Sequence, residues 1–199
     1  MIRRLAAALL VLGVLAGCTA SSGSDRTTPF PNNPDHAHLV RVAALEPCPA
    51  ASGGSASGGL PDVTLPCLGR GPAVHLSALR GVPMVVNLWG SWCGPCQKET
   101  PFLQQAHQRL GSAVRFLGVD TEDSADSALD FAAHVRPPMR YPSVVDDDKT
   151  VLLSVHGPSA VPMTLFVDSN GHVVHLSIKS YDSVGAVLGD VARYLGVRR

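Results

Sequence analysis

The sequence lacks three features that would decide its class at once. It has no net charge, because 16 Lys and Arg residues balance 16 Asp and Glu residues, so electrostatics gives no argument for nucleic-acid binding. No apolar run reaches the length of a membrane-spanning helix, about 18 residues, and nothing recurs at the fixed period of a repeat protein. The 199 residues are nevertheless 45% hydrophobic, which excludes wholesale disorder and predicts one packed domain with extensions.

The first 17 residues are typical of a targeting segment. Arg3 and Arg4 precede an apolar run at 5–15, which has the length of a signal-peptide core and is too short to span a bilayer. Cys18 follows Leu-Ala-Gly, as in a bacterial lipobox, where a cysteine bearing two acyl chains is stably anchored. We therefore expect residues 1–17 to be a lipoprotein signal peptide and Cys18 to be lipidated. The alternatives are an ordinary signal peptide with a chance cysteine, or a short core helix.

Residues 18–59 are predicted to form a lipidated tether. The stretch 19–35 is rich in Ser, Thr, Pro, Asn and Gly, and the stretch 51–59 reads ASGGSASGG, so both have too little apolar surface to order themselves. Between them, apolar residues at roughly helical spacing in 35–46 could form a short helix. We expect the folded domain to begin near Leu60 and to occupy residues 60–199.

Patterning from residue 60 onward predicts an α/β domain. Alternating segments on either side of 69–72 predict a hairpin, and 168–171 is typical of a second hairpin turn. The expected buried strands are 82–89 and 114–119, the expected hairpin strands are 163–167 and 172–178, and the expected helices are 95–111, 124–135, 148–156 and 183–195. This order predicts a central mixed β-sheet flanked by helices, with the first hairpin as an N-terminal extension. The acidic run 146–148 is predicted to be a solvated turn and the start of a helix.

The segment Trp92-Cys93-Gly94-Pro95-Cys96 follows a buried strand and begins a helix. Cys93 then faces free backbone N–H groups and the positive end of the helix dipole, which stabilise a thiolate. Pro95 suits the first helical turn, and Cys96 is near enough to attack a mixed disulfide formed by Cys93. We therefore predict a redox disulfide between these two cysteines.

Other uses of a CxxC segment fit less well. Covalent haem needs histidine after the second cysteine, where this chain has Gln97. Structural zinc needs a second ligand pair, and Cys48 and Cys67 are not spaced as one. The eight histidines form no cluster in the sequence, so a copper-chaperone role is disfavoured. We expect neither a metal nor a cofactor.

The run VVNLWGSWCGPC at 85–96 resembles the thioredoxin superfamily, and within it the extracytoplasmic TlpA/ResA/DsbE-like thiol–disulfide oxidoreductases. The resemblance extends over residues 60–199 and implies a thioredoxin fold, with Trp92 and Gly94 as parts of the active-site motif. It also implies a cis-proline at Pro162, preceded by Val161, whose backbone would pair with an extended substrate segment. The alternative is a trans proline that begins an edge strand.

The resemblance gives Glu99 a role in moving protons to and from the thiols. Glu99 lies three residues after Cys96 and on the same side of the predicted helix. Asn87 stands where cytoplasmic thioredoxins have a buried acid, which leaves Glu99 as the only nearby candidate base. The alternative is an exposed glutamate that merely favours the first turns of a helix.

Two cysteines remain after Cys18 and the CxxC pair are assigned. Outside the cytoplasm, Cys48 and Cys67 are expected to form a structural disulfide, which closes a loop of about 20 residues and contributes about 3 kcal/mol. The alternative is two separate free thiols.

These features together predict a membrane-anchored, extracytoplasmic thiol–disulfide oxidoreductase that reduces protein disulfides. The resemblance implies disulfide-bearing protein substrates, a membrane electron donor of the CcdA/DsbD type and a role in cytochrome c maturation. The expected location is the outer side of the cell membrane, through the lipid anchor, with no nucleic-acid partner. The alternatives are a disulfide oxidase or isomerase for secreted proteins, and a non-catalytic lipoprotein binding module with a structural CxxC. An exposed Cys93 would distinguish an enzyme from a binding module.

Overall fold

A computed structural model of the chain describes residues 34–50, 53–155 and 158–198. The expected signal peptide, the expected lipidation site Cys18 and residues 18–33 of the expected tether lie outside the described residues. Within the described part of the chain, no helix combines the length and the hydrophobicity needed to cross a membrane.

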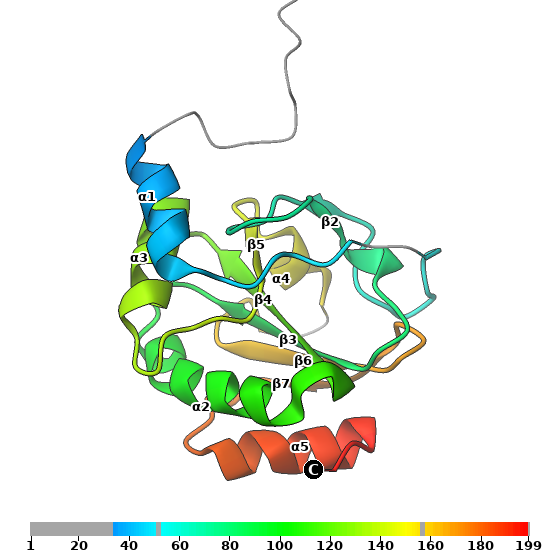
Figure 1. Cartoon of the computed structure of the whole chain (residues 1–199). Coiled ribbons are helices and arrows are strands. Elements are labelled where there is room, and N and C mark those ends of the chain that lie inside the picture. The colour runs from blue at the N-terminus through cyan, green and yellow to red at the C-terminus, as the bar shows by residue number, and fades with distance from the viewer. Residues whose placement is uncertain (1–33, 51–52, 156–157, 199) are drawn as a thin grey trace, which may run out of the picture.

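A mixed five-stranded sheet forms the centre of the molecule (Figure 1). Its order is β5-β4-β3-β6-β7; β3, β4 and β5 run parallel, whereas β6 is antiparallel to both of its neighbours. A separate antiparallel pair, β1 and β2, forms the N-terminal hairpin. The predicted α/β fold with a hairpin extension is therefore confirmed. The strands are β1 (Thr64–Leu65), β2 (Val74–His75), β3 (Met84–Trp89), β4 (Arg115–Thr121), β5 (Ser143–Asp146), β6 (Met163–Val167) and β7 (Val173–Ser177), and the α-helices are α1 (Pro34–Ala43), α2 (Gly94–Leu110), α3 (Ala125–His134), α4 (Thr150–Ser154) and α5 (Val184–Leu195).

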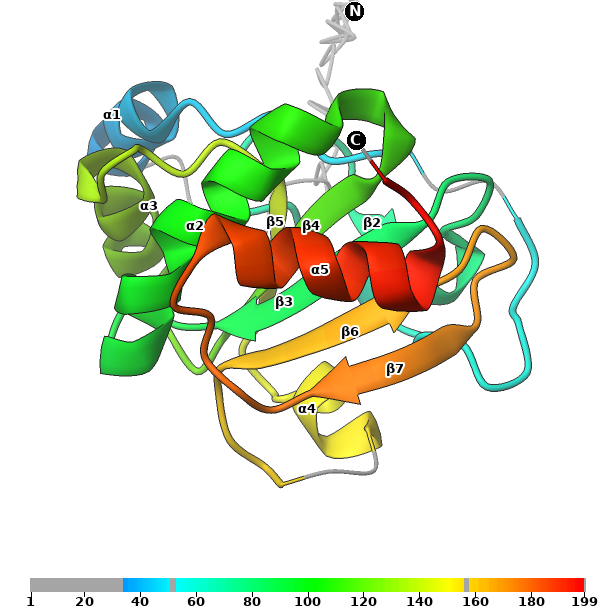
Figure 2. The same ribbon diagram turned by 90° about the horizontal axis from the view of Figure 1, so that it is seen from below.

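The residues of β3 alternate between two hydrophobic cores, one on each face of the sheet. Val85 and Trp89 pack with buried residues of α1, α2, α3 and α5, whereas Val86 and Leu88 pack with α4 and the hairpin. Figure 2 shows α2 and α5 side by side across one face of the sheet. Burial on both faces explains why this strand is a nearly continuous apolar run in the sequence.

The folded body begins earlier than expected, because α1 is part of it. Ala43 and Leu45 are buried in the same core as Trp89, and α1 lies against α3 (Figure 1). We expected the folded domain to begin near Leu60. That boundary is wrong because the apolar side of α1 finds its partners on a helix some ninety residues later in the chain.

The glycine-rich stretch at 51–59 is ordered at its C-terminal end. Residues 51–52 lie outside the described residues, but Gly59 forms a β-bridge with His172, and the N–H of Val173 donates to the carbonyl of Gly58 at 3.0 Å. The expectation of a flexible segment is therefore wrong for residues 58–59, because the beginning of β7 supplies backbone partners.

Strand β5 was not expected, and Asp146 at its end is not solvated. Asp146 is buried, and its carboxylate oxygens accept hydrogen bonds from the N–H groups of Thr150 and Val151 at 2.8 and 2.9 Å. These are free N–H groups of the first turn of α4, which a carboxylate stabilises. The prediction of a solvated turn is correct for Asp147 and Asp148, which are exposed.

Candidate active site

The two cysteines of the CxxC segment lie at the N-terminus of α2 and form a disulfide. Cys93 is the N-cap residue of this helix, and the N–H of Cys96 donates to its sulfur at 3.2 Å. The sulfur of Cys93 thus receives a backbone donor and lies at the positive end of the helix dipole. Both features stabilise a thiolate once the disulfide is reduced.

The loop before Cys93 is held by polar contacts from three directions. The N–H of Ser91 donates to a carboxylate oxygen of Asp123 at 2.6 Å, and its carbonyl accepts from the side chain of Gln97 at 2.6 Å. The indole N–H of Trp92 donates to the carbonyl of Thr121 at 3.3 Å, and Trp92 is 54% exposed. A fixed loop with an exposed aromatic ring gives a substrate an apolar surface beside the reactive sulfur.

The segment before β6 closes over Cys93. The Val161–Pro162 peptide bond is cis, and the carbonyl oxygen of Val161 lies 3.7 Å from the sulfur of Cys93. Cys93 is only 4% exposed in this disulfide form, although we expected an exposed Cys93 in an enzyme. The difference arises because the Val161 segment lies against the sulfur.

Glu99 is buried one turn beyond Cys96 and is held from two elements. Asn87 of β3 donates to one carboxylate oxygen at 2.9 Å, and the N–H of Tyr181, before α5, donates to the other at 3.0 Å. Burial raises the pKa of Glu99 from 4.5 to about 7, against the lowering effect of these two hydrogen bonds. The alternative of an exposed glutamate does not describe this side chain, which is fully buried.

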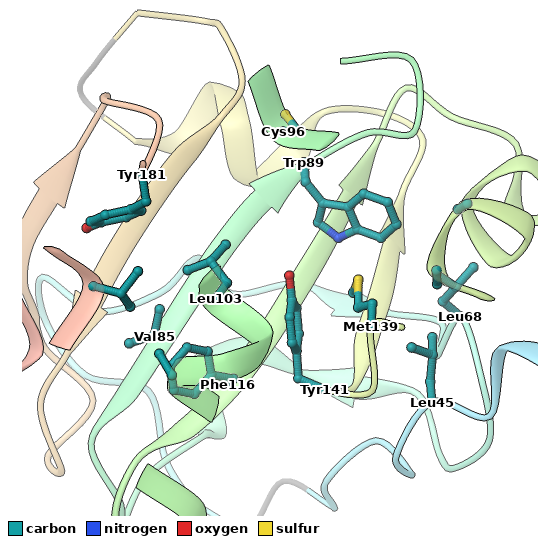
Figure 3. Close-up of a cluster of buried hydrophobic side chains, with 14 of the residues drawn as sticks. Leu45, Leu68, Val85, Trp89, Cys96, Leu103, Phe116, Met139, Tyr141 and Tyr181 are labelled. Atoms are coloured by element: carbon teal, nitrogen blue, oxygen red, sulfur yellow. The ribbon is translucent and has the colours of Figure 1, made fainter. Parts of the chain in front are cut away.

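Asn87 connects Glu99 to the neighbouring strand. Its amide nitrogen also lies 3.3 Å from the hydroxyl of Thr164, its register partner on β6. Asn87 therefore donates to the carboxylate where a second carboxylate would repel it. Burial raises the pKa of the Tyr141 hydroxyl, and the negative charge of Glu99 raises this pKa further. Figure 3 shows Tyr141 with Trp89 and Met139 in this core.

A second buried carboxyl group belongs to Asp120, near the C-terminal end of the inner strand β4. It is the last residue but one of β4 and is in register with Trp89. Burial raises its pKa from 3.8 to about 8, and the negative charges of Asp123 and Asp147 add to this. Asp120 is thus a second buried carboxyl group with a raised pKa, in addition to Glu99. The signal for Asp120 was an acid that directly continues a buried apolar strand.

The remaining cysteine pair belongs to the other hydrophobic core, on the opposite face of the sheet from Cys93 and Cys96. Cys48 and Cys67 form a disulfide across a separation of 19 residues. Cys67 also forms a β-bridge with Val144 of β5, so the disulfide joins the segment after α1 to the hairpin and to the sheet. Cys18 lies outside the described residues. In the described part of the chain, no group of three or more His, Cys, Asp or Glu residues could hold a metal ion.

A mixed sheet, a CxxC disulfide at a helix N-terminus and a neighbouring cis-proline define a thioredoxin-like fold with a dithiol–disulfide site. Comparison with known families agrees with this class. The chain belongs to the AhpC/TSA family, whose pattern matches residues 58–176.

Curated relatives carry names from the same chemistry. The chain is 33% identical over 115 residues to the thiol:disulfide interchange protein DsbE of Xylella fastidiosa strain 9a5c, which covers 57% of this chain and 56% of that one. It is 30% identical over 106 residues to the thiol-disulfide oxidoreductase ResA of Bacillus subtilis strain 168, which covers 53% and 58%. The chain thus matches a little over half of the length of these relatives.

Solved structures also share the fold. A secreted thiol-disulfide isomerase from Corynebacterium glutamicum is 27% identical, with a TM-score of 0.56 over 65% of this chain and 81% of that one. The structure of MTB dsbF in its mixed oxidised and reduced forms is 25% identical, with a TM-score of 0.56 over 67% and 95%.

Proposed function

We propose that the protein is a thiol–disulfide oxidoreductase that reduces disulfides of protein substrates. The observation that carries the proposal is the Cys93 sulfur, which accepts the N–H of Cys96 at the start of α2 and lies beside the carbonyl of Val161. This arrangement favours a nucleophilic thiolate, and the Val161 backbone can pair with an extended substrate segment. The names of the relatives support the same chemistry.

The reaction is an exchange of two electrons. The thiolate of Cys93 attacks one sulfur of the substrate disulfide, a mixed disulfide forms, and the other substrate sulfur leaves as a thiolate and takes a proton. The thiolate of Cys96 then attacks the Cys93 sulfur and releases the second substrate thiolate. The protein ends as the Cys93–Cys96 disulfide, and the substrate ends as a dithiol. We propose that Glu99, one turn beyond Cys96 on α2, exchanges protons with the Cys96 thiol.

Replacing each of the two cysteines in turn tests this order of events. In the Cys96→Ser protein, the mixed disulfide cannot be resolved, so we expect it to accumulate on Cys93. The Cys93→Ser protein should form none and should not reduce insulin. Non-reducing electrophoresis and an insulin-reduction assay measure both. Trapping by the Cys93→Ser protein would reverse the assignment, and an inactive wild-type protein would favour the non-catalytic binding module.

The direction in the cell depends on the reduction potential of the pair. Gly94 and Pro95 give the intervening dipeptide of reducing thioredoxin, whose potential is about −270 mV, and we infer a reductase. A redox titration of the Cys93–Cys96 pair against glutathione or dithiothreitol measures it. A value near −270 mV supports a reductase, whereas a value near −120 mV would assign an oxidase.

The proposal includes an extracytoplasmic, lipid-anchored location. Its support is the lipobox-like segment that ends at Cys18, together with a second disulfide, Cys48–Cys67, of the kind that persists in oxidising compartments. A membrane electron donor of the CcdA/DsbD type would return electrons to the oxidised pair, and cytochrome c maturation is the proposed context. Deletion of such a donor should leave Cys93 and Cys96 oxidised in cells, which thiol alkylation detects.

A further inference from the structure

A groove of about 780 Å³ lies between α1, α2 and α3, directly beside the active-site loop. Leu39 of α1 and Phe131 of α3 contribute apolar surface, and Ser91 and Gln97 line the end nearest to Cys93. Ser91 precedes Cys93 by two residues, and Gln97 lies in the first turns of α2. A chain segment attached to a substrate cysteine can therefore enter the groove while its disulfide reaches the active site.

The groove is acidic along the side formed by α3. Asp126 and Asp130 both line it and lie one helical turn apart on the same face of the helix. Their side chains are 46% and 62% exposed. Asp123, which holds Ser91, continues this acidic side to the active-site loop. Negative charges spaced along an apolar groove favour a ligand with basic and apolar side chains.

The basic residues that contact these two carboxylates are histidines. His36 and His134 contact Asp126 and Asp130 at 2.6 and 3.2 Å, and a histidine balances a carboxylate only when it is protonated. No lysine or arginine lines the groove among the described residues. Arg136, which follows α3, donates to the carbonyls of the last residues of its own helix.

We propose that this groove binds a basic segment of the disulfide-bearing substrate, with lysine or arginine and one apolar residue next to the substrate cysteine. The proposal rests on the oxidoreductase function proposed above and adds a substrate class to it. The groove depends on α1, which lies before residue 58, where the family match begins. The chain's own residues 19–33 are a poorer occupant, because they carry one aspartate and one arginine and so have no net positive charge.

The test compares three peptides that share one disulfide and one leucine but differ in flanking charge. The flanks are lysine, glutamate or serine, and the reduced protein is mixed with each peptide to measure the rate constant of a single exchange. We expect the lysine peptide to react about three- to tenfold faster than the glutamate peptide. In about 1 M salt, where the Debye length is about 3 Å, this ratio should fall toward one.

Variants locate the effect. The ratio of the lysine to the glutamate rate constant should fall below about twofold in the Asp126→Asn/Asp130→Asn protein. The single Asp130→Asn variant should lower the ratio in part, and it changes a more exposed side chain. Glu46→Gln is the matched control, because Glu46 also pairs with a histidine, His107 at 2.9 Å, but at the opposite end of the sheet. Its ratio should equal that of the wild type.

The outcomes separate this proposal from the function on which it depends. Equal rates for the lysine and glutamate peptides, or a ratio that survives in the double variant, would overturn the groove as a basic-peptide site and leave the oxidoreductase intact. A preference that emerges only after deletion of residues 19–33 would assign the groove to the chain itself and would also overturn the proposal. Failure of all three peptides to react would overturn the oxidoreductase function.

Discussion

Glu99 is a buried carboxyl group on the helix that carries Cys96, and it has no positively charged hydrogen-bond partner among the described residues. Asn87 and the backbone of Tyr181 hydrogen-bond to it, but neither carries a charge. With a pKa of about 7, it changes its protonation state where thiol–disulfide exchange proceeds. A carboxyl group that titrates with nearby thiols couples its proton equilibrium to theirs.

We expect Glu99→Gln to change the pH dependence of exchange. Glutamine keeps the size and the helix propensity of the side chain but cannot titrate. The pKa values of Cys93 and Cys96 in the reduced protein should shift, and the pH–rate profile should change with them. Alkylation rates measured across the pH range report the thiols. If both the thiol titration and the pH–rate profile match the wild type, Glu99 has no part in proton transfer.

The same substitution has a consequence for stability. The pKa of Glu99 is raised above its ordinary value of 4.5, so the folded protein holds this proton more tightly than the unfolded chain. The free energy of unfolding therefore falls as the pH rises from about 4.5 to about 7, by on the order of 3 kcal/mol from this group. Urea unfolding at both ends of this range should show a smaller loss in Glu99→Gln. The raised pKa of Asp120 acts in both proteins and cancels in the comparison. If the free energy of unfolding falls equally in both proteins, the fold does not raise the pKa of Glu99.

The sequence indicates the residue types of the site but not their surroundings. The helix after the CxxC segment places Glu99 near Cys96, and this is visible in the spacing. One of its hydrogen bonds comes from the backbone of Tyr181, 82 residues away in the chain, and no local sequence pattern indicates this contact. Asp120 could have been noticed, because a strand that is buried throughout also buries the acid that continues it.

At the scale of elements, the close contact of β4 with its neighbours depends on Gly118. A Cβ atom added there would lie 2.2 Å from the hydroxyl of Ser143 on β5 and 2.7 Å from the indole nitrogen of Trp89 on β3. We expect Gly118→Ala to destabilise the protein by about 1–3 kcal/mol through overpacking. Thermal unfolding followed by circular dichroism measures this.

Gly189 is the matched control for that substitution. It lies within α5, and a Cβ atom there meets no heavy atom within 4 Å. Gly189→Ala should stabilise the protein by about 0.5–1 kcal/mol, because alanine is the better helix former. If Gly118→Ala also raises the thermal stability, as expected for Gly189→Ala, the contact at Gly118 does not limit the spacing of the strands.

The Cys48–Cys67 disulfide adds a covalent link between the segment after α1 and the N-terminal hairpin. Replacing both cysteines with alanine should lower the free energy of unfolding by about 3 kcal/mol, since the loop of the unfolded chain is no longer closed. The reduction potential of Cys93–Cys96 should stay at the wild-type value. Urea unfolding and a redox titration test the two statements. An unchanged stability would mean that the segment after α1 is held by its other contacts.

Elements with strong local patterns were predicted correctly, and the exceptions have a common cause. The central strands, α2, α3 and α5 each show an apolar face or a cap, such as Ser124, whose side chain accepts the N–H of Ser127. Strand β5 has only four residues and its last residue begins the acidic run, so its two valines make too short a pattern to predict a strand. Both β5 and the packing of α1 depend on partners distant in sequence, which no local pattern reveals.

At the scale of the whole molecule, the proposed anchor and the redox site are separate. Cys18 lies sixteen residues before the first described helix and 75 residues before Cys93 in the sequence. Cys18→Ser should therefore move the protein from the membrane fraction to the soluble fraction and leave its exchange rate with insulin unchanged. Cell fractionation and an activity assay measure the two. A variant that stays in the membrane fraction would contradict lipidation at Cys18.

The position of α1 limits where an anchored protein can work. His36, in the first turn of α1, contacts Asp126 in the first turn of α3, so the chain enters the folded body at the edge that carries the CxxC disulfide. Residues 19–33 number 15 and can span at most about 50 Å when fully extended. If Cys18 is lipidated as proposed, this length would limit how far the reactive sulfur can lie from the membrane surface. A donor or substrate would then have to present its own cysteines within that distance, so distance from the lipid would become a selection step that precedes any chemical recognition.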